Sequence, residues 1–161
     1  MSQNQSKYYD QIELKETDAI EILKTEYFYL QNAIDKYDEK AISIKSWSIT
    51  FSLTLFGSAL ISHDKNLFLL SSISSLLFWI IETYWKVFQK AYYQRTWDIE
   101  RFLQNKYVEK FRVPNVTGSY TNEVKKILKN DFFKLMLLPQ VYLPHFIILV
   151  IGFISWISKI Q

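Results

Sequence analysis

Three long apolar stretches constrain the fold of this chain more than any other feature of its sequence. They cover residues 41–62, 67–88 and 141–157. A helix that crosses a bilayer needs about 20 mostly apolar residues, with about 17 as the lower limit. The second stretch meets this length if Glu82 lies at one interface, and the third is short but very apolar. The first is marginal, because Ser and Thr recur in it and Lys45 lies near its start.

The alternative to a membrane protein is a soluble bundle of fully buried helices. Buried core helices typically contain about 10–14 consecutive apolar residues, and two of the three stretches are longer. Aromatic residues also gather at the ends of the stretches, as expected where helices meet lipid headgroups. These residues are Trp47, Trp79, Tyr84, Trp85, Tyr142 and Trp156. We therefore expect an all-α integral membrane protein.

The residue inventory argues against a reactive site. The chain has no Cys and only two His, which excludes a disulfide scaffold, a Cys zinc site and a thiol nucleophile. No phosphate-binding loop, dinucleotide-binding glycine pattern, nucleophile elbow or metal motif occurs. We expect no enzymatic activity, cofactor or metal, with intramembrane lipid chemistry as the remaining alternative. Basic and aromatic residues interleave over 86–112, but acids dilute them, and we do not expect a nucleic acid partner.

The pattern divides the chain into four regions. Residues 1–40 are expected to form a cytoplasmic heptad helix, and 41–88 a transmembrane hairpin. Residues 89–139 are expected to extend the second helix and then lie at the interface, and 140–161 to form a third membrane segment. The connection at 63–66 is short enough to make the first two membrane helices antiparallel neighbours.

The distribution of Lys and Arg predicts the orientation. Residues 83–139 contain eleven of them, whereas the hairpin connection contains Lys65 and the C-terminal tail contains Lys159. Because Lys and Arg collect on the cytoplasmic side, we expect 83–139 and the N-terminus in the cytoplasm. The C-terminus lies outside if the third segment spans the membrane, and inside if Pro144 makes that segment re-entrant.

Apolar residues in the N-terminal region recur at alternating spacings of three and four, the pattern of a heptad seam. They are Ile20, Leu23, Tyr27, Leu30, Ile34 and Tyr37. This pattern predicts either an amphipathic helix that packs on its own chain or a coiled coil between subunits. Residues 1–40 carry nine acids and five bases, whereas 83–139 carry five acids and eleven bases, so the two arms are expected to lie side by side.

The region after the hairpin predicts one long helix and one shorter helix. No Gly or Pro occurs over 67–113, so the second membrane helix should continue to Pro114. Residues 114–122 are loop-like in composition. Residues 123–138 predict an amphipathic helix with lysines along its border, which fits a helix lying on an anionic membrane surface. Its apolar face comprises Val124, Ile127, Leu128, Phe132, Leu135 and Met136.

A few polar side chains within the apolar stretches are the candidate functional residues. Glu82 could line an ion path or pair with Lys45 across the hairpin, or it could pair with Lys86 at the interface. The serines of both hairpin helices, Ser71 and Ser75 among them, favour close helix packing, with a polar pore lining as the alternative. His145 could be a titratable switch or a side chain satisfied by a carbonyl near Pro144.

The layout and two strings of residues resemble the SLATT-type bacterial membrane proteins. The resemblance covers roughly residues 24–103 and depends on the sequences at 23–50 and 78–102. It implies a two-helix membrane hairpin with cytoplasmic helices, in an effector that forms pores in nucleotide-triggered antiviral defence. The third apolar stretch and the lack of an attached sensor domain differ from that plan.

Two functional hypotheses follow. The first is a homo-oligomeric membrane effector that permeabilises the membrane or conducts ions when a protein or nucleotide activates its cytoplasmic helices. The second is a non-conducting scaffold or regulatory subunit that presents those helices to a protein partner. In both, membrane lipids are partners of the apolar helices.

Overall fold

The computed structural model describes residues 16–104 and 116–158, and these form helices joined by short connections. The helices are α2 (Glu16–Ser62), α3 (Asn66–Gln104), α4 (Val116–Asn130), α5 (Phe132–Met136) and α6 (Pro139–Ile157). Three of them, α2, α3 and α6, are long and apolar enough to cross a membrane. No strand occurs in the described ranges. The prediction of an all-helical chain with three membrane-length helices is confirmed, and it indicates a membrane protein.

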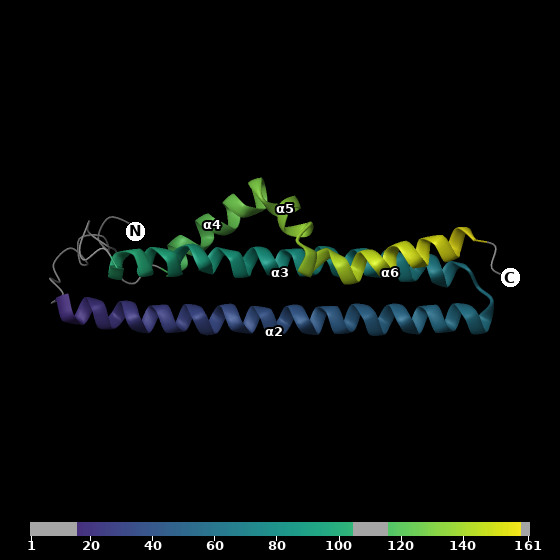
Figure 1. Cartoon of the computed structure of the whole chain (residues 1–161), viewed down its shortest axis with the longest axis horizontal. Helices are drawn as coiled ribbons and strands as arrows, with labels where there is room; N and C mark the ends of the chain where they lie inside the picture. Colours follow the sequence, from purple (N-terminus) through teal and green to yellow (C-terminus); the bar gives the residue numbers. More distant parts are fainter. Residues whose placement is uncertain (1–15, 105–115, 159–161) are drawn as a thin grey trace, which may run out of the picture.

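The long helices α2 and α3 form an antiparallel pair, and α3 contacts every other helix (Figure 1). Helix α6 lies along the half of α3 that is next to the hairpin turn, whereas α4 and α5 lie over the other half. The turn consists of residues 63–65, one fewer than the sequence predicts. His63 adopts a left-handed backbone with a φ of 54°. The Asp64 carboxylate accepts a hydrogen bond from the Asn66 backbone N–H at 3.0 Å and so caps α3.

Two apolar clusters hold the halves of α2 and α3 that are far from the turn. In the first, Leu23 and Leu30 of α2 pack against Ile99 of α3. In the second, Val87 and Ala91 of α3 are covered by α4 and α5. The residues supplied by α4 and α5 are Tyr120, Val124, Ile127, Phe132 and Leu135, and Leu138, just before α6, packs on the same cluster. Helix α3 is therefore the helix against which both clusters pack.

The structure corrects the prediction for residues 114–138 in two respects. Helix α4 begins at Val116, so residues 116–122 are helical and not a loop. The apolar face that the sequence assigned to a membrane surface lies largely against α3, where Ile127 and Leu135 are buried. The prediction failed because propensity favours turns at the polar residues before Glu123, whereas packing on α3 stabilises a helix there.

Prolines mark the start of α6 and also occur within it. Pro139 occupies the first turn, where a missing N–H costs nothing. The helix continues through Pro144 to Ile157, which is a membrane-length segment without a re-entrant break. Helix α3 follows the predicted long helix as far as Gln104, and the remainder of that prediction, residues 105–113, lies outside the described residues.

Three tyrosines join α2, α3 and α4. The ring of Tyr92 lies between those of Tyr37 and Tyr120, with centroid separations of 5.8 Å and 4.7 Å. Burial, followed by interactions with Tyr37, raises the pKa of both Tyr92 and Tyr120. Neutral phenols therefore stabilise the contact between α4 and the long hairpin.

Candidate functional site: a buried polar network

Each of the three membrane-length helices supplies a polar side chain to one network. Helix α2 supplies Lys45 and Ser48, which share a face because they are three residues apart. Helix α3 supplies Glu82, and α6 supplies His145, the residue after Pro144. Two distant parts of the sequence thus meet where α6 lies against the hairpin.

Glu82 is the centre of the network. One carboxylate oxygen lies 2.9 Å from the Lys45 ammonium, and the other lies 2.9 Å from Nε2 of His145. Nδ1 of His145 lies 3.0 Å from the hydroxyl of Ser48. The structure therefore brings together Lys45 and Glu82, the pairing considered from the sequence, and adds two partners to them.

Both ring nitrogens of His145 have side-chain partners. Nε2 lies against a carboxylate oxygen of Glu82, and Nδ1 lies against the Ser48 hydroxyl. An imidazole can hydrogen-bond through both of its nitrogens, so every ring nitrogen is satisfied.

The network is almost completely enclosed. Ser48 and His145 have no exposed surface, and Glu82 is 1% exposed. Only Lys45 reaches outward, with 28% of its side chain exposed. Large apolar side chains cover the outside of the same helices. A buried ion pair surrounded by apolar side chains carries a desolvation penalty that apolar residues of similar volume would avoid.

Serines and a glycine draw α6 close to α3 beside the network. Ser75 donates a hydrogen bond to the His145 carbonyl at 2.8 Å, and Ser72 donates one to the Leu149 carbonyl at 3.1 Å. A Cβ on Gly152 would collide with the Ser72 hydroxyl, so only glycine allows this approach. Small hydroxylated residues of this kind are typical of helix contacts in membranes.

The candidate serines Ser71 and Ser75 face the inside of the described chain. Ser71 donates a hydrogen bond to the Ser52 carbonyl of α2 at 3.3 Å, whereas Ser75 faces α6. Both are fully buried. In this conformation they hold helices together, and α6 covers the polar side of the hairpin.

The predicted heptad seam faces α3 of the same chain. Leu23, Leu30 and Ile34 are buried there, and the Tyr27 hydroxyl donates to Glu100 at 3.0 Å. Tyr37 contacts the rings of Trp85 and Tyr92, and Ile20 is half-buried. The observed arrangement is thus the amphipathic alternative considered from the sequence, in which these positions pack on their own chain.

A second buried ion pair lies between the outer halves of the hairpin. The guanidinium of Arg95 contacts both carboxylate oxygens of Glu26, at 2.7 Å and 2.8 Å. Nearby, the Gln89 amide donates to the Ile34 carbonyl at 3.2 Å. These contacts fix the register of the acidic arm on the basic arm, as the charge distribution predicts.

The network has the chemical order of a hydroxyl, an imidazole and a carboxylate, which is also the order of a hydrolytic triad. Ser48 is fully buried, so a substrate does not reach its hydroxyl in this conformation. Lys45 also pairs with the carboxylate that would support the imidazole. The arrangement links three helices through hydrogen bonds and an ion pair. Within the described ranges, no group of three His, Asp or Glu side chains could hold a metal.

Sequence reasoning considered the pairing of Glu82 with Lys45, but it treated His145 separately and missed the contact of His145 with Glu82 and Ser48. His145 was considered with a carbonyl partner, whereas its ring contacts two side chains. The sequence does contain a signal for this contact. Lys45, Glu82 and His145 are all ionisable residues within apolar stretches, and such groups pair with one another in membranes.

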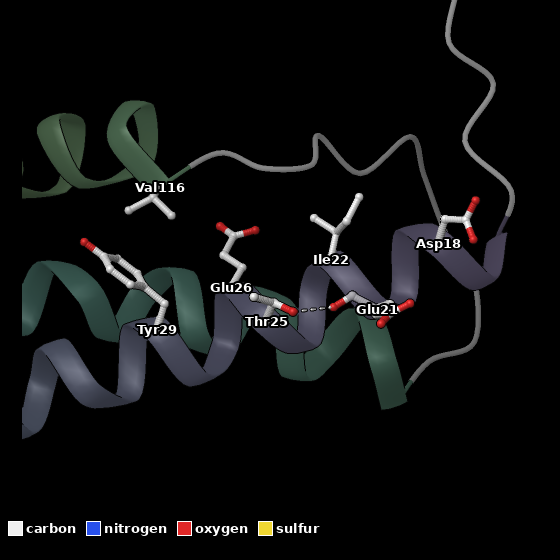
Figure 2. Close-up of a pocket in the computed structure, with 7 residues that line it drawn as sticks. All are labelled: Asp18, Glu21, Ile22, Thr25, Glu26, Tyr29 and Val116. Atoms are coloured by element: carbon white, nitrogen blue, oxygen red, sulfur yellow. Dashed lines mark hydrogen bonds between the residues drawn. The ribbon is translucent and has the colours of Figure 1, made fainter.

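An open pocket lies at the far end of α2. It has a volume of about 590 Å³ and its lining carries the carboxylates of Asp18, Glu21 and Glu26 (Figure 2). Tyr29 and Val116 also line it. On α2 this acidic pocket is lined by residues between Asp18 and Tyr29, whereas the buried network begins at Lys45 of the same helix.

Comparisons of the chain with protein-family models, curated proteins and solved structures find no match. The class of protein is therefore defined by the fold itself: an all-helical protein with three helices that could cross a membrane.

Proposed function

We propose that the protein is a homo-oligomeric membrane effector that permeabilises a membrane or conducts ions when activated, and that this structure is its closed form. The observation that supports this proposal is the buried network of Lys45, Glu82 and His145 at the contact of three apolar helices. Such a network costs stability that apolar side chains would provide, so a role beyond packing explains it best.

Opening in this proposal is a movement of α6 away from the hairpin. That movement would uncover Ser48, Ser75 and Glu82, which are now buried, and so create a polar surface. The contact between α3 and α6 is held by hydroxyl-to-carbonyl hydrogen bonds, which are individually weak.

The proposed setting follows from charge. The lysine- and arginine-rich region beyond residue 83 favours a bacterial inner membrane with the N-terminus in the cytoplasm. The activating ligand would be a protein or nucleotide that binds the outer halves of α2 and α3. Antiviral defence is the role that the SLATT-type layout favours, and no enzymatic step is part of the proposal.

The test is ion flux through proteoliposomes that contain the full-length protein. Flux is measured at several pH values between about 5 and 8. The wild type should conduct in at least part of this range. The variant Lys45→Met/Glu82→Met/His145→Leu should stay folded, because apolar replacement of a complete ion pair is often neutral, but it should lose at least about tenfold of the flux.

The matched control is Lys36→Met/Glu39→Met, which removes an exposed cation and an exposed carboxylate from α2. It should conduct as the wild type does. Absence of flux from the wild type throughout the pH range would contradict the proposal. Equal flux from the wild type and the apolar network variant would also contradict it.

A scaffold that presents helices to a protein is the second candidate, and the acidic pocket favours it. Tyr29 lines that pocket and is 59% exposed, and its neighbour in the sequence, Phe28, is 69% exposed. Adjacent exposed aromatic side chains of this kind can mark a binding surface. A scaffold predicts a stoichiometric heteromeric complex in native membranes that Phe28→Ala/Tyr29→Ala abolishes. If the complex survives this change, the pocket is not the partner's binding surface.

A further inference from the structure

The sequence predicts one helix over residues 123–138, but the structure divides this stretch into α4 and α5. The break between them creates an exposed face that the sequence pattern does not show. Helix α4 ends at Asn130, and α5 starts at Phe132 with a change of direction (Figure 1). The inner face of this elbow covers α3. The outer face, which we call the elbow face, consists of Lys125, Leu128, Lys129, Phe133, Lys134 and Leu137.

The elbow face combines exposed apolar side chains with exposed cations. Phe133 is 77% exposed and Leu137 is 66% exposed, although both are large and apolar. Lys125 and Lys129 are exposed and have no carboxylate partner within the described ranges. Lys134 pairs with Asp131, yet 80% of its side chain is still exposed.

Contacts with α3 place this face at the level where the apolar spans end. The indole of Trp79 donates a hydrogen bond to the Met136 carbonyl of α5 at 2.9 Å. The ring of Tyr84 contacts Phe132, with centroids 5.1 Å apart. Trp and Tyr concentrate at the membrane–water interface. Leu137 lies two residues before Pro139, the first residue of the apolar helix α6, so the elbow face leads directly into that helix.

We propose that the elbow face binds the surface of an anionic bilayer, with Phe133 and Leu137 among the acyl chains and Lys125 and Lys129 on phospholipid headgroups. The apolar side chains supply burial, and the lysines supply attraction to negative lipids. A bilayer is favoured over a protein partner because the face is continuous with α6. This inference is independent of ion conduction.

Because the chain contains no Cys, an introduced cysteine can be labelled at that position alone. A single cysteine replaces Phe133 in the full-length protein and carries an environment-sensitive fluorophore. The protein is placed in phosphatidylcholine vesicles, with or without phosphatidylglycerol. With the anionic lipid, the emission should shift to the blue, and quenching by aqueous iodide should fall severalfold. The same label at Asn122, an exposed polar position of α4, should remain quenchable in both lipids.

Charge variants separate lipid binding from other causes of protection. Lys125→Gln/Lys129→Gln should restore quenching of the label at position 133, whereas Lys24→Gln/Lys36→Gln, which removes two exposed cations from α2, should not. Equal quenching at 133 and 122 in anionic vesicles would overturn the proposal. Protection that is the same without anionic lipid and grows with protein concentration would show a second copy on this face, and would also overturn it. Neither result depends on flux.

Discussion

His145 has a side-chain partner on each ring nitrogen, and these partners decide what the residue can do. Glu82 accepts from one nitrogen, and Ser48 contacts the other. All three side chains are buried, so these contacts are shielded from water. A single imidazole therefore links three helices, because it joins α6 to Ser48 of α2 and to Glu82 of α3.

His63 gives a prediction at the same scale. Its left-handed backbone, with a φ of 54°, crowds the Cβ against the following carbonyl. We expect His63→Gly to raise the free energy of unfolding by about 1 kcal/mol, measured by denaturation in detergent micelles. Lys65→Gly, in the same turn, is the control and should not stabilise. Equal effects of the two changes would show that the backbone of His63 is not strained.

At the scale of elements, the close crossing of α3 and α6 depends on Gly152, which has no side chain. A Cβ at Gly152 would collide with the Ser72 hydroxyl and lie 3.0 Å from the Phe68 carbonyl. The backbone oxygen cannot move without shifting a helix, so the closeness of the two helices is fixed by this position. The serines that hydrogen-bond across the same contact depend on that closeness.

Gly152→Ala should therefore destabilise the protein by about 1–3 kcal/mol, the usual cost of overpacking a tight contact. Gly57→Ala is the matched control, because a Cβ there meets no atom within 4 Å. Thermal unfolding in micelles measures both. Similar losses of stability at the two glycines would contradict the close crossing.

The tyrosine contact between α2, α3 and α4 predicts a pH dependence. Burial raises the pKa of Tyr92 and Tyr120 above the ordinary value of 10.0. A raised pKa means that this stabilisation is complete below the ordinary value and is lost as pH rises through the folded-state value. We expect α4 to separate from the hairpin in strong alkali, observed by hydrogen exchange. Tyr120→Phe should weaken that pH dependence, and an unchanged alkaline response would contradict it.

The elements themselves could largely be predicted from sequence, whereas their contacts could not. The length of the third apolar stretch predicted α6, and the heptad spacing predicted the outer half of α2, because both are local patterns in the sequence. The start of α4 at Val116 was missed, because packing of Tyr120 and Val124 on α3 outweighs local turn propensity. The Ser48–His145 contact was missed, because it joins residues 97 positions apart, and no local pattern records that register.

At the scale of the whole molecule, the long hairpin exceeds any bilayer. Helix α2 has 47 residues, which at 1.5 Å per residue is roughly 70 Å, against about 30 Å of hydrocarbon. More than half of it lies beyond the apolar span, together with the matching half of α3. A single chain thus carries a small membrane bundle and a long paired arm.

The number of copies decides whether such a bundle can surround a pore. Native mass spectrometry of the detergent-purified full-length protein should show a ring of roughly four or more subunits, enough helices to enclose a polar channel. A monomer or dimer would contradict a central pore and favour the scaffold. The Lys36→Met/Glu39→Met variant should leave the mass unchanged.

The short turn at residues 63–65 has a consequence for how the protein is made. When a helical hairpin enters a bilayer as one unit, the only polar chain that must be carried to the far side is its turn. Here that load is His63, Asp64 and Lys65. In the proposed orientation the paired arm remains on the side of synthesis, so insertion of the hairpin requires less translocation than export of a folded domain does.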